Sequence, residues 1–357
     1  MKTSRTKFLP MQSVYRSRLG RATAFGALVL LFAATPGPAS AQDKSYVMKV
    51  TLPTLNDATH QLAKNFAAAV ERDSAGRIKP EIYPASQLGS MPRQIEGVQF
   101  GAIQCSVIPP EFFVGVDERF EVLTAPGLVS TLEQGQRLAA DPAVLKLMLG
   151  LGANKGLHGV GLFMAIPSSV ISRTPIRHLD DFEGKKIRIF ASQFQSVALQ
   201  RLGAAPVAMS LSDVMPALQQ GAIDGAVAAL AVYTPMHFQD AAKYVTETGQ
   251  PSIFVTIEIS SRWYKTLPAD LQWIIDRDGA AVSVVTNPAA IEQVEKFRKG
   301  WVSGGGELIS LPPNEQSTML TSLASVGDEV SKDKPELSAA YQVVKDAAKR
   351  ARQAASQ

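Results

Sequence analysis

The sequence lacks the residue patterns on which most catalytic, metal and redox sites depend. Cys105 is the single cysteine among 357 residues, which excludes an internal disulfide, and its apolar surroundings predict a small buried side chain. The four histidines, at positions 60, 158, 178 and 237, are scattered without the spacing of metal ligands. Gly-x-Ser-x-Gly, His-Glu-x-x-His and Walker motifs are missing. We therefore expect a protein that is not an enzyme and that needs no metal and no cofactor.

The sequence also lacks a basic excess outside its N-terminus. Residues 1–41 hold six of the 36 lysines and arginines and none of the 32 acidic residues, so 30 basic residues face 32 acidic ones in the remainder. A nucleic-acid partner needs a basic surface, and the composition of residues 42–357 argues against one.

The N-terminus has the pattern of a secretory signal peptide. Its basic residues precede an apolar run from Thr23 to Ala34 and the small-x-small sequence Ala39-Ser40-Ala41, which predicts cleavage after Ala41. An uncleaved membrane anchor is the alternative, but the run is short for a span of about twenty residues. We therefore predict a periplasmic protein whose mature chain comprises residues 42–357.

The mature chain contains two segments in which strands and helices alternate. In the first, strands are predicted at 46–52, 77–84 and 102–108 and helices at 56–76 and 92–101. In the second, strands are predicted at 185–190, 205–209 and 222–230 and helices at 192–203 and 212–221. This alternation is typical of an α/β fold with largely parallel sheets. A loop-rich segment near 165–175 is expected to join two lobes with a cleft between them.

Ligands bind to such folds at the carboxyl ends of the strands. The segments expected to line the cleft follow Leu52, Ile108, Phe190, Met209 and Ala226. The strand predicted in Gly184–Phe190 contains an unexpected cation: Ile187 and Ile189 face one side, while Arg188 points to the other. A guanidinium beside a core requires a partner.

Two motifs resemble those of the DctP-type solute-binding proteins of tripartite ATP-independent periplasmic (TRAP) transporters. They are SAGRI followed by YPASQLG within residues 74–89, and ALQQGAIDG at residues 217–225. The resemblance covers nearly all of the mature chain. It implies two α/β lobes, a ligand cleft between them and a long helix that spans both. The implied domains are discontinuous, with lobe I at 42–165 and 254–293 and lobe II at 166–253 and 294–357.

The resemblance also implies a function. Proteins of this kind capture a small organic acid between closing lobes, deliver it to a membrane permease and are usually monomers. At the matching position an arginine binds the carboxylate of the substrate, which assigns this role to Arg188, and a planar guanidinium suits a carboxylate bidentately. The alternative is an ion pair between Arg188 and a neighbouring aspartate that holds the lobe together. The other residues expected near the ligand are Phe190, Gln193, Leu211, Ala228, Tyr233 and, from a looser match, Arg173.

Several positions that are polar in the resembling family are apolar here. They are Pro53, Pro109 and the run Ala226–Ala229, and Leu211 stands where the family commonly has an aromatic residue. A sugar acid would leave hydroxyl groups unpaired in such a pocket, at a cost of about 1–3 kcal/mol each. We therefore predict a carboxylate with an apolar or aromatic body, although the alanines could instead form a wall that never touches ligand. Asp224 and Gly225 are expected to be structural, with the glycine permitting a turn at the end of a strand.

Two other functions remain open from the sequence. A sensor subunit would close on a ligand in the same way and then bind a receptor. A periplasmic hydrolase would need a nucleophile beside a base, which the scattered histidines do not favour. Turnover separates the hydrolase from the other two, because a binding protein returns its ligand unchanged.

Overall fold

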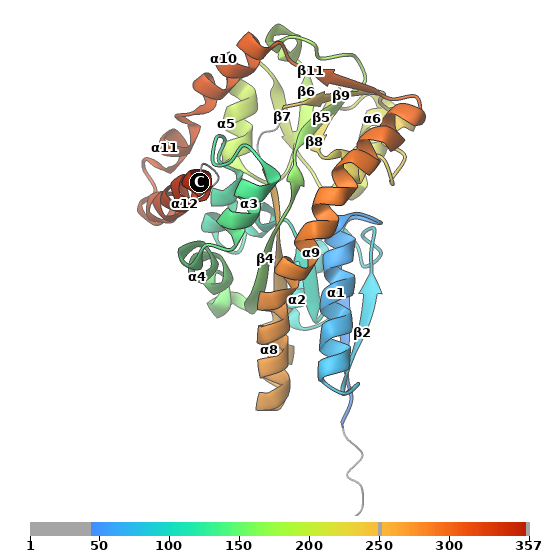
Figure 1. Ribbon diagram of the computed structural model, residues 1–357, viewed down its shortest axis with the longest axis vertical. Helices are drawn as coiled ribbons and strands as arrows, with labels where there is room; N and C mark the ends of the chain where they lie inside the picture. Colours follow the sequence, from blue (N-terminus) through green and yellow to red (C-terminus); the bar gives the residue numbers. More distant parts are fainter. Residues whose placement is uncertain (1–43, 249–251, 355–357) are drawn as a thin grey trace, which may run out of the picture. The chain divides into compact units, whose positions relative to one another are not determined.

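Two mixed β-sheets organise the chain (Figure 1). The computed structural model describes residues 44–248 and 252–354, so the predicted signal peptide and its cleavage site lie outside the described residues. The first sheet has the order β2-β1-β3-β10-β4, with strands Ile78–Tyr83, Tyr46–Thr51, Cys105–Ile108, Ser252–Ser260 and Leu157–Pro167. The second has the order β11-β9-β5-β8-β6-β7, with strands Glu307–Ser310, Tyr244–Glu247, Ser169–Ser172, Gly225–Ala228, Lys186–Ile189 and Ala205–Ala208.

The strand pairing confirms the predicted α/β class, but each sheet contains antiparallel as well as parallel pairs. β1 pairs in parallel with β2 and β3, and β6 pairs in parallel with β7 and β8. By contrast, β10 is antiparallel to both of its neighbours, and so is β5. Each sheet therefore combines strands from separate stretches of the chain. The exact lobe boundaries stay a prediction.

The segment near residues 165–175 is not the loop-rich linker predicted from the sequence. β4 ends at Pro167 and β5 begins at Ser169, with Ser168 alone between them. Val170 and Ile171 are β-branched and buried, which favours a strand over a loop. The chain thus crosses from one sheet to the other almost without interruption.

Helices cover the sheets and connect the strands. The α-helices of the described residues are α1 (Ala58–Asp73), α2 (Met91–Phe100), α3 (Leu132–Ala139), α4 (Pro142–Gly150), α5 (Gln193–Arg201), α6 (Leu211–Gln220), α7 (Leu230–Tyr233), α8 (Ser261–Tyr264), α9 (Ala269–Ser303), α10 (Pro313–Leu323), α11 (Val326–Ser331) and α12 (Pro335–Gln353). Two 3-10 helices, η1 (Pro110–Phe113) and η2 (Glu118–Thr124), follow β3. Within the described residues, every helix is too short or too polar to cross a lipid bilayer.

The first helix shows how local sequence sets these boundaries. Asp57 is the N-cap of α1, and its side chain accepts a hydrogen bond from the backbone N–H of His60. Leu62, Phe66 and Val70 recur at helical spacing and are fully buried. α1 is thereby fixed along the first sheet, with its N-terminus near the carboxyl end of β1.

The longest helix, α9, packs against elements of both sheets. It contacts α1 and β4 on the first sheet, and α7 and β11 on the second (Figure 1). Pro288 lies inside this helix, where it removes one main-chain hydrogen bond without ending the helix. The expected long helix spanning both parts of the fold is therefore present.

Gly225 has a different structural role from the one predicted. It is the first residue of β8 and not the last of a strand, and its φ is not in the left-handed region. A Cβ atom at this position would lie 2.5 Å from the Ile171 carbonyl oxygen, so close approach of β5 requires glycine. Asp224 accepts a hydrogen bond from the Lys186 N–H at 2.9 Å, which supports the structural role expected for it.

A row of buried polar side chains crosses the first sheet. Thr51 lies opposite Ser106, and Ser106 lies opposite Glu258 on the fully buried strand β10. Glu258 Oε1 accepts a hydrogen bond from Thr256 Oγ1 at 2.7 Å, while Oε2 and the hydroxyls of Thr51 and Ser106 have no partner among the protein groups described. Burial raises the pKa of Glu258 to about 8. At neutral pH the carboxyl group is therefore largely protonated and can donate to a neighbouring hydroxyl.

We predict that ionisation of Glu258 destabilises the fold at alkaline pH. Because its folded pKa lies above its unfolded value, the unfolding free energy is highest at low pH and falls as the pH rises toward 8. Glu258→Gln cannot ionise, so its loss between pH 5.5 and pH 8.5 should be smaller than that of the wild type by up to about 3 kcal/mol. Urea unfolding at the two pH values measures this difference. Exposed Glu71→Gln is the control, and equal losses in the wild type and Glu258→Gln would contradict the prediction.

Candidate functional site

A cavity lies where the carboxyl ends of strands from the two sheets meet. In this structure about 40 Å³ of it is open to the centres of water molecules. Residues of the first sheet and its connections that line it are Pro53, Thr54, Asp57, Thr59, Met91, Pro109, Phe112, Ala165, Ile166, Ile253 and Val255. From the second sheet and its connections come Phe190, Leu211, Ala228 and Val232. Four of the five segments that were expected to line the cleft contribute to this wall, and the fifth is represented only by Phe190, the residue that precedes it.

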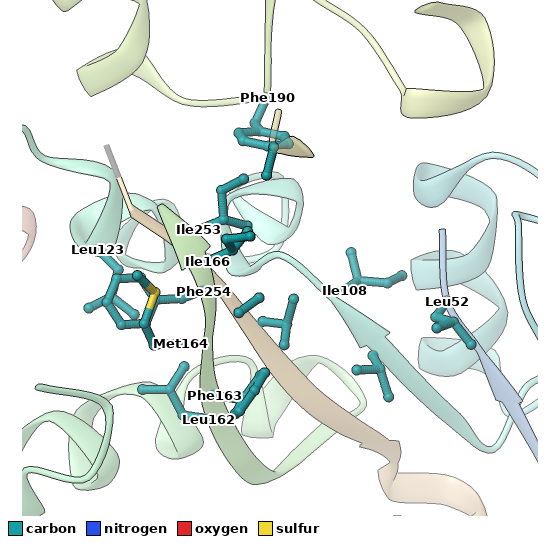
Figure 2. Close-up of a cluster of buried hydrophobic side chains, with 14 of the residues drawn as sticks. Leu52, Ile108, Leu123, Leu162, Phe163, Met164, Ile166, Phe190, Ile253 and Phe254 are labelled. Carbon is teal, nitrogen blue, oxygen red and sulfur yellow. The ribbon is translucent and has the colours of Figure 1, made fainter. Parts of the chain in front are cut away.

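Apolar side chains dominate the wall. Phe190, which follows the end of β6, lies close to Ile166 of β4 and Ile253 of β10 (Figure 2). The rings of Phe112 and Phe190 meet edge to face, with centroids 5.6 Å apart. Thr54, Asp57 and Thr59, around the N-terminus of α1, are the polar members of the lining. The cavity therefore has an apolar body with a small polar region at one helix end.

Arg188 lies against this wall and is fully buried. Its Nε donates a hydrogen bond to the Met209 carbonyl at 3.0 Å, and Nη1 donates to the Val227 carbonyl at 2.9 Å. The guanidinium carbon lies 4.6 Å from the ring centroid of Phe190 and 5.9 Å from that of Phe112. Both rings line the cavity, whereas Arg188 is not itself among the lining residues, so its guanidinium lies behind the rings.

The charge of Arg188 is not neutralised by an ion pair. Among the described residues no carboxylate lies within 4.0 Å of it, and its Nη2 has no hydrogen-bond partner. Burial lowers its pKa to about 10, so the group still carries its charge at neutral pH. The alternative of a structural aspartate pair is therefore not supported by the geometry. A buried cation with unused donors is costly unless an anion completes it.

Two acidic residues lie near the site, and burial raises the pKa of both. The pKa of Glu111, which interacts electrostatically with Arg188, is raised to about 8 by burial. The pKa of Asp57, which accepts hydrogen bonds from Thr54 and His60, is raised to about 6 by burial. Glu111 is thus largely uncharged at neutral pH and leaves the positive charge of Arg188 available. Sequence analysis assigned Glu111 no role, because only the fold reveals that it is buried.

The structure brings some of the predicted residues into the cavity wall and places others elsewhere. Phe190, Leu211 and Ala228 line the cavity. Tyr233 is fully buried, but its hydroxyl donates to the Ala226 carbonyl at 2.8 Å and is thereby used inside the second sheet. Tyr233 is not among the lining residues, so we do not carry it into the site.

Arg173 and Gln193 also lie outside the cavity wall. Arg173 is exposed, and its guanidinium lies beside Gly221 at the end of α6. Gln193 is exposed at the start of α5, where its backbone N–H donates to Glu121.

Sequence reasoning missed several lining residues, among them Phe112, Met91 and Ile253. Phe112 lies in η1, two residues after the Pro109-Pro110 pair, and Met91 is the first residue of α2. Nothing in their local pattern distinguishes them from core side chains, because their position depends on how the two sheets meet. In the part of the chain that is described, no group of three or more His, Cys, Asp and Glu side chains is placed to hold a metal ion.

The chain matches known proteins over most of its length. Residues 50–333 match the family model DctP, bacterial extracellular solute-binding protein, family 7. The C4-dicarboxylate-binding periplasmic protein DctP of Rhodobacter capsulatus is 27% identical over 272 residues, which cover 75% of this chain and 81% of the relative.

Solved structures share the fold at low sequence identity. The sugar acid binding protein DctPAm from Advenella mimigardefordensis, in complex with galactonate, has a TM-score of 0.80 at 20% identity, covering 86% of this chain and 99% of its own. A TRAP periplasmic solute-binding protein from Desulfovibrio salexigens with bound orotic acid has a TM-score of 0.78 at 20% identity, covering 85% and 100%. The two-lobed periplasmic binding fold is therefore shared.

We predict that Arg188 is dispensable for folding. Arg188→Met keeps much of the side-chain volume and removes a buried charge, so the unfolding free energy of the ligand-free protein should stay within about 2 kcal/mol of the wild-type value or rise. Urea unfolding of the ligand-free proteins measures this change. Arg188→Lys is the companion variant, since it keeps the buried charge but loses the fork of donors. A loss above about 4 kcal/mol in Arg188→Met would indicate that Arg188 holds the second sheet together.

Proposed function

Because the chain belongs to bacterial extracellular solute-binding protein family 7, the DctP-type solute-binding proteins of TRAP transporters, we propose that it captures a small organic acid in the periplasm and delivers it to a membrane permease. The family consists of binding components of transport systems and not of enzymes. The predicted signal peptide supports the periplasmic location. The observation that carries the ligand class is the buried, charged and incompletely paired guanidinium of Arg188 behind the cavity wall.

A carboxylate fits the unused donors of this guanidinium. Nε and Nη1 are fixed by the Met209 and Val227 carbonyls, which leaves Nη2 to bind the ligand. The two carbonyls also hold the guanidinium plane, so the side chain is ordered before ligand arrives. In a cavity closed to water the charge-assisted hydrogen bond is stronger than on a surface.

The composition of the wall supports closure of the two lobes on the ligand. Phe190, Leu211 and Ala228 come from the second sheet, whereas Pro53, Phe112 and Ile253 come from the first sheet and its connections. A ligand that touches both sets stabilises their approach, because each set alone leaves the ligand exposed. The closed form would then be the state that the permease recognises.

The wall supports a ligand with one carboxylate and an apolar or aromatic body. Phe112, Phe190, Ile166 and Ile253 offer ring and branched surfaces and no hydrogen bonds to hydroxyl groups. None of the lining residues is basic, and Asp57 among them would repel a second carboxylate. Relatives named for C4-dicarboxylates, galactonate and orotic acid share the carboxylate and differ in the body.

A calorimetric panel tests the ligand class. Phenylacetate, benzoate and 4-methylpentanoate should bind at least tenfold more tightly than succinate or galactonate, since the latter carry groups that the wall cannot pair. Arg188→Met should remove binding of every acid, while Arg173→Met should bind as the wild type does because Arg173 is exposed beside Gly221. Tightest binding of galactonate or succinate would overturn the ligand class. Undiminished binding by Arg188→Met would overturn the anchor.

The affinity should depend on pH through Glu111. Below about 8 this carboxyl is largely protonated, whereas above that pH its charge competes with the ligand for Arg188. The ligand carboxylate stays ionised throughout, so affinity should fall several-fold between pH 7 and pH 9. Glu111→Gln should flatten this dependence, and exposed Glu96→Gln should not. An equally steep decline in Glu111→Gln would refute the assignment.

A further inference from the structure

The cavity wall contains a buried acid that a simple carboxylate ligand leaves without a partner. Asp57 lines the cavity and is 4% exposed. Thr54 Oγ1 and the His60 N–H donate to its Oδ1 at 2.9 and 2.8 Å, so Oδ2 keeps capacity for a further donor. Nearby hydrogen-bond donors favour the charged carboxylate, but burial outweighs them and raises its pKa to about 6. Asp57 is therefore mostly charged at neutral pH, in apolar surroundings where a lone charge is costly.

The charges of Asp57 and Arg188 do not cancel each other. Among the described residues, neither side chain forms an ion pair. Burial and hydrogen bonds are the main influences on the pKa of Asp57, and no charged side chain is among them. The side chains that act electrostatically on Arg188 do not include Asp57. Because Coulomb attraction weakens with distance, the two groups are too far apart for either to neutralise the other.

The wall that both groups adjoin is apolar, and this limits which ligands can balance them. Phe112, Phe190 and Ile253 offer no charge, and none of the lining residues is basic. A monocarboxylate with an apolar end would complete Arg188 and leave the charge of Asp57 buried. A dicarboxylate would bring a like charge against Asp57. Only a ligand that carries one charge of each sign, held apart by an apolar segment, neutralises both groups.

We propose that the ligand is a zwitterion whose carboxylate binds Arg188 Nη2 and whose primary ammonium donates to Asp57 Oδ2. An ω-amino acid or an aminomethyl aromatic acid has this form. In an α-amino acid both charges adjoin one carbon atom, so they cannot reach two separated groups. The remaining ammonium donors can bond to the hydroxyl oxygens of Thr54 and Thr59, which lie at the same end of the cavity lining.

This inference rests on the proposed function, because it keeps Arg188 as the partner of the ligand carboxylate. It adds Asp57 as a residue that determines specificity. Asp57 is the N-cap of α1, which packs on the first sheet, whereas Arg188 lies in β6 of the second. A zwitterion bound to both residues connects the two sheets through its own length, so ligands of the wrong length cannot engage both ends.

Calorimetry with matched acids at pH 7.5 tests the ammonium site. The wild type should bind 4-(aminomethyl)benzoate at least tenfold more tightly than 4-methylbenzoate, because a hydrogen bond between two charged groups is strong in a cavity closed to water. In the series from 4-aminobutanoate to 8-aminooctanoate, affinity should pass through a maximum at the length that spans both residues.

Asp57→Asn tests the assignment to this carboxylate. Asparagine is also a good N-cap, so α1 should keep its start and the variant should fold. It should bind 4-(aminomethyl)benzoate and 4-methylbenzoate with affinities within about twofold, since the charge that distinguishes them is removed. Asp141→Asn is the matched control, because Asp141 is the N-cap of α4 and lies outside the cavity lining. It should keep the wild-type preference.

The possible outcomes separate this inference from the proposed function. Equal wild-type affinities for the two benzoates would overturn the inference and leave the Arg188 anchor intact. A preference that Asp57→Asn retains would also overturn it, because another group would then bind the ammonium. Binding of 4-(hydroxymethyl)benzoate as tight as that of the aminomethyl acid would assign Asp57 to a hydroxyl group and refute the cationic end. A wild type that binds no carboxylate at all would overturn the proposed function, and this inference with it.

Discussion

The candidate site depends on one unsatisfied interaction, the free Nη2 of a guanidinium that is buried and charged. Main-chain carbonyls of Met209 and Val227 take two donors of Arg188, and the rings of Phe190 and Phe112 cover it. These contacts order the side chain without neutralising it. Because Glu111 is largely uncharged at neutral pH, it does not neutralise Arg188 either. The free energy that the fold loses by burying this charge is available to an anion that completes the group, which is how a binding site trades stability for affinity.

The rest of the architecture positions this group. The chain passes from the first sheet to the second between β4 and β5, which only Ser168 separates. It returns to the first sheet between β9 and β10. These crossings put the carboxyl ends of strands from both sheets around one cavity. Because α9 packs on both sheets, a change in their relative position must involve that helix. Ligand capture and the position of helix α9 are therefore mechanically connected.

Sequence patterns predicted the features that local chemistry decides. The helix predicted at 56–76 and the placing of Arg188 opposite Ile187 and Ile189 follow from spacing alone. Side-chain destinations that depend on strand pairing could not be predicted. Tyr233 was expected near the ligand, but its hydroxyl donates to the Ala226 carbonyl inside the second sheet. Arg173 was expected there too, but its guanidinium lies beside Gly221. Phe112 joined the cavity only because η1 meets the end of β6, a contact between residues far apart in the chain.

A crystal structure of the protein with a bound acid tests the central claim most directly. We expect one carboxylate oxygen within hydrogen-bond distance of Arg188 Nη2, with the body of the ligand against Phe112, Phe190 and Ile253. The Met209 and Val227 carbonyls should keep their bonds to Arg188. A ligand carboxylate held by other groups, with Nη2 unpaired or bonded to Glu111, would contradict the account.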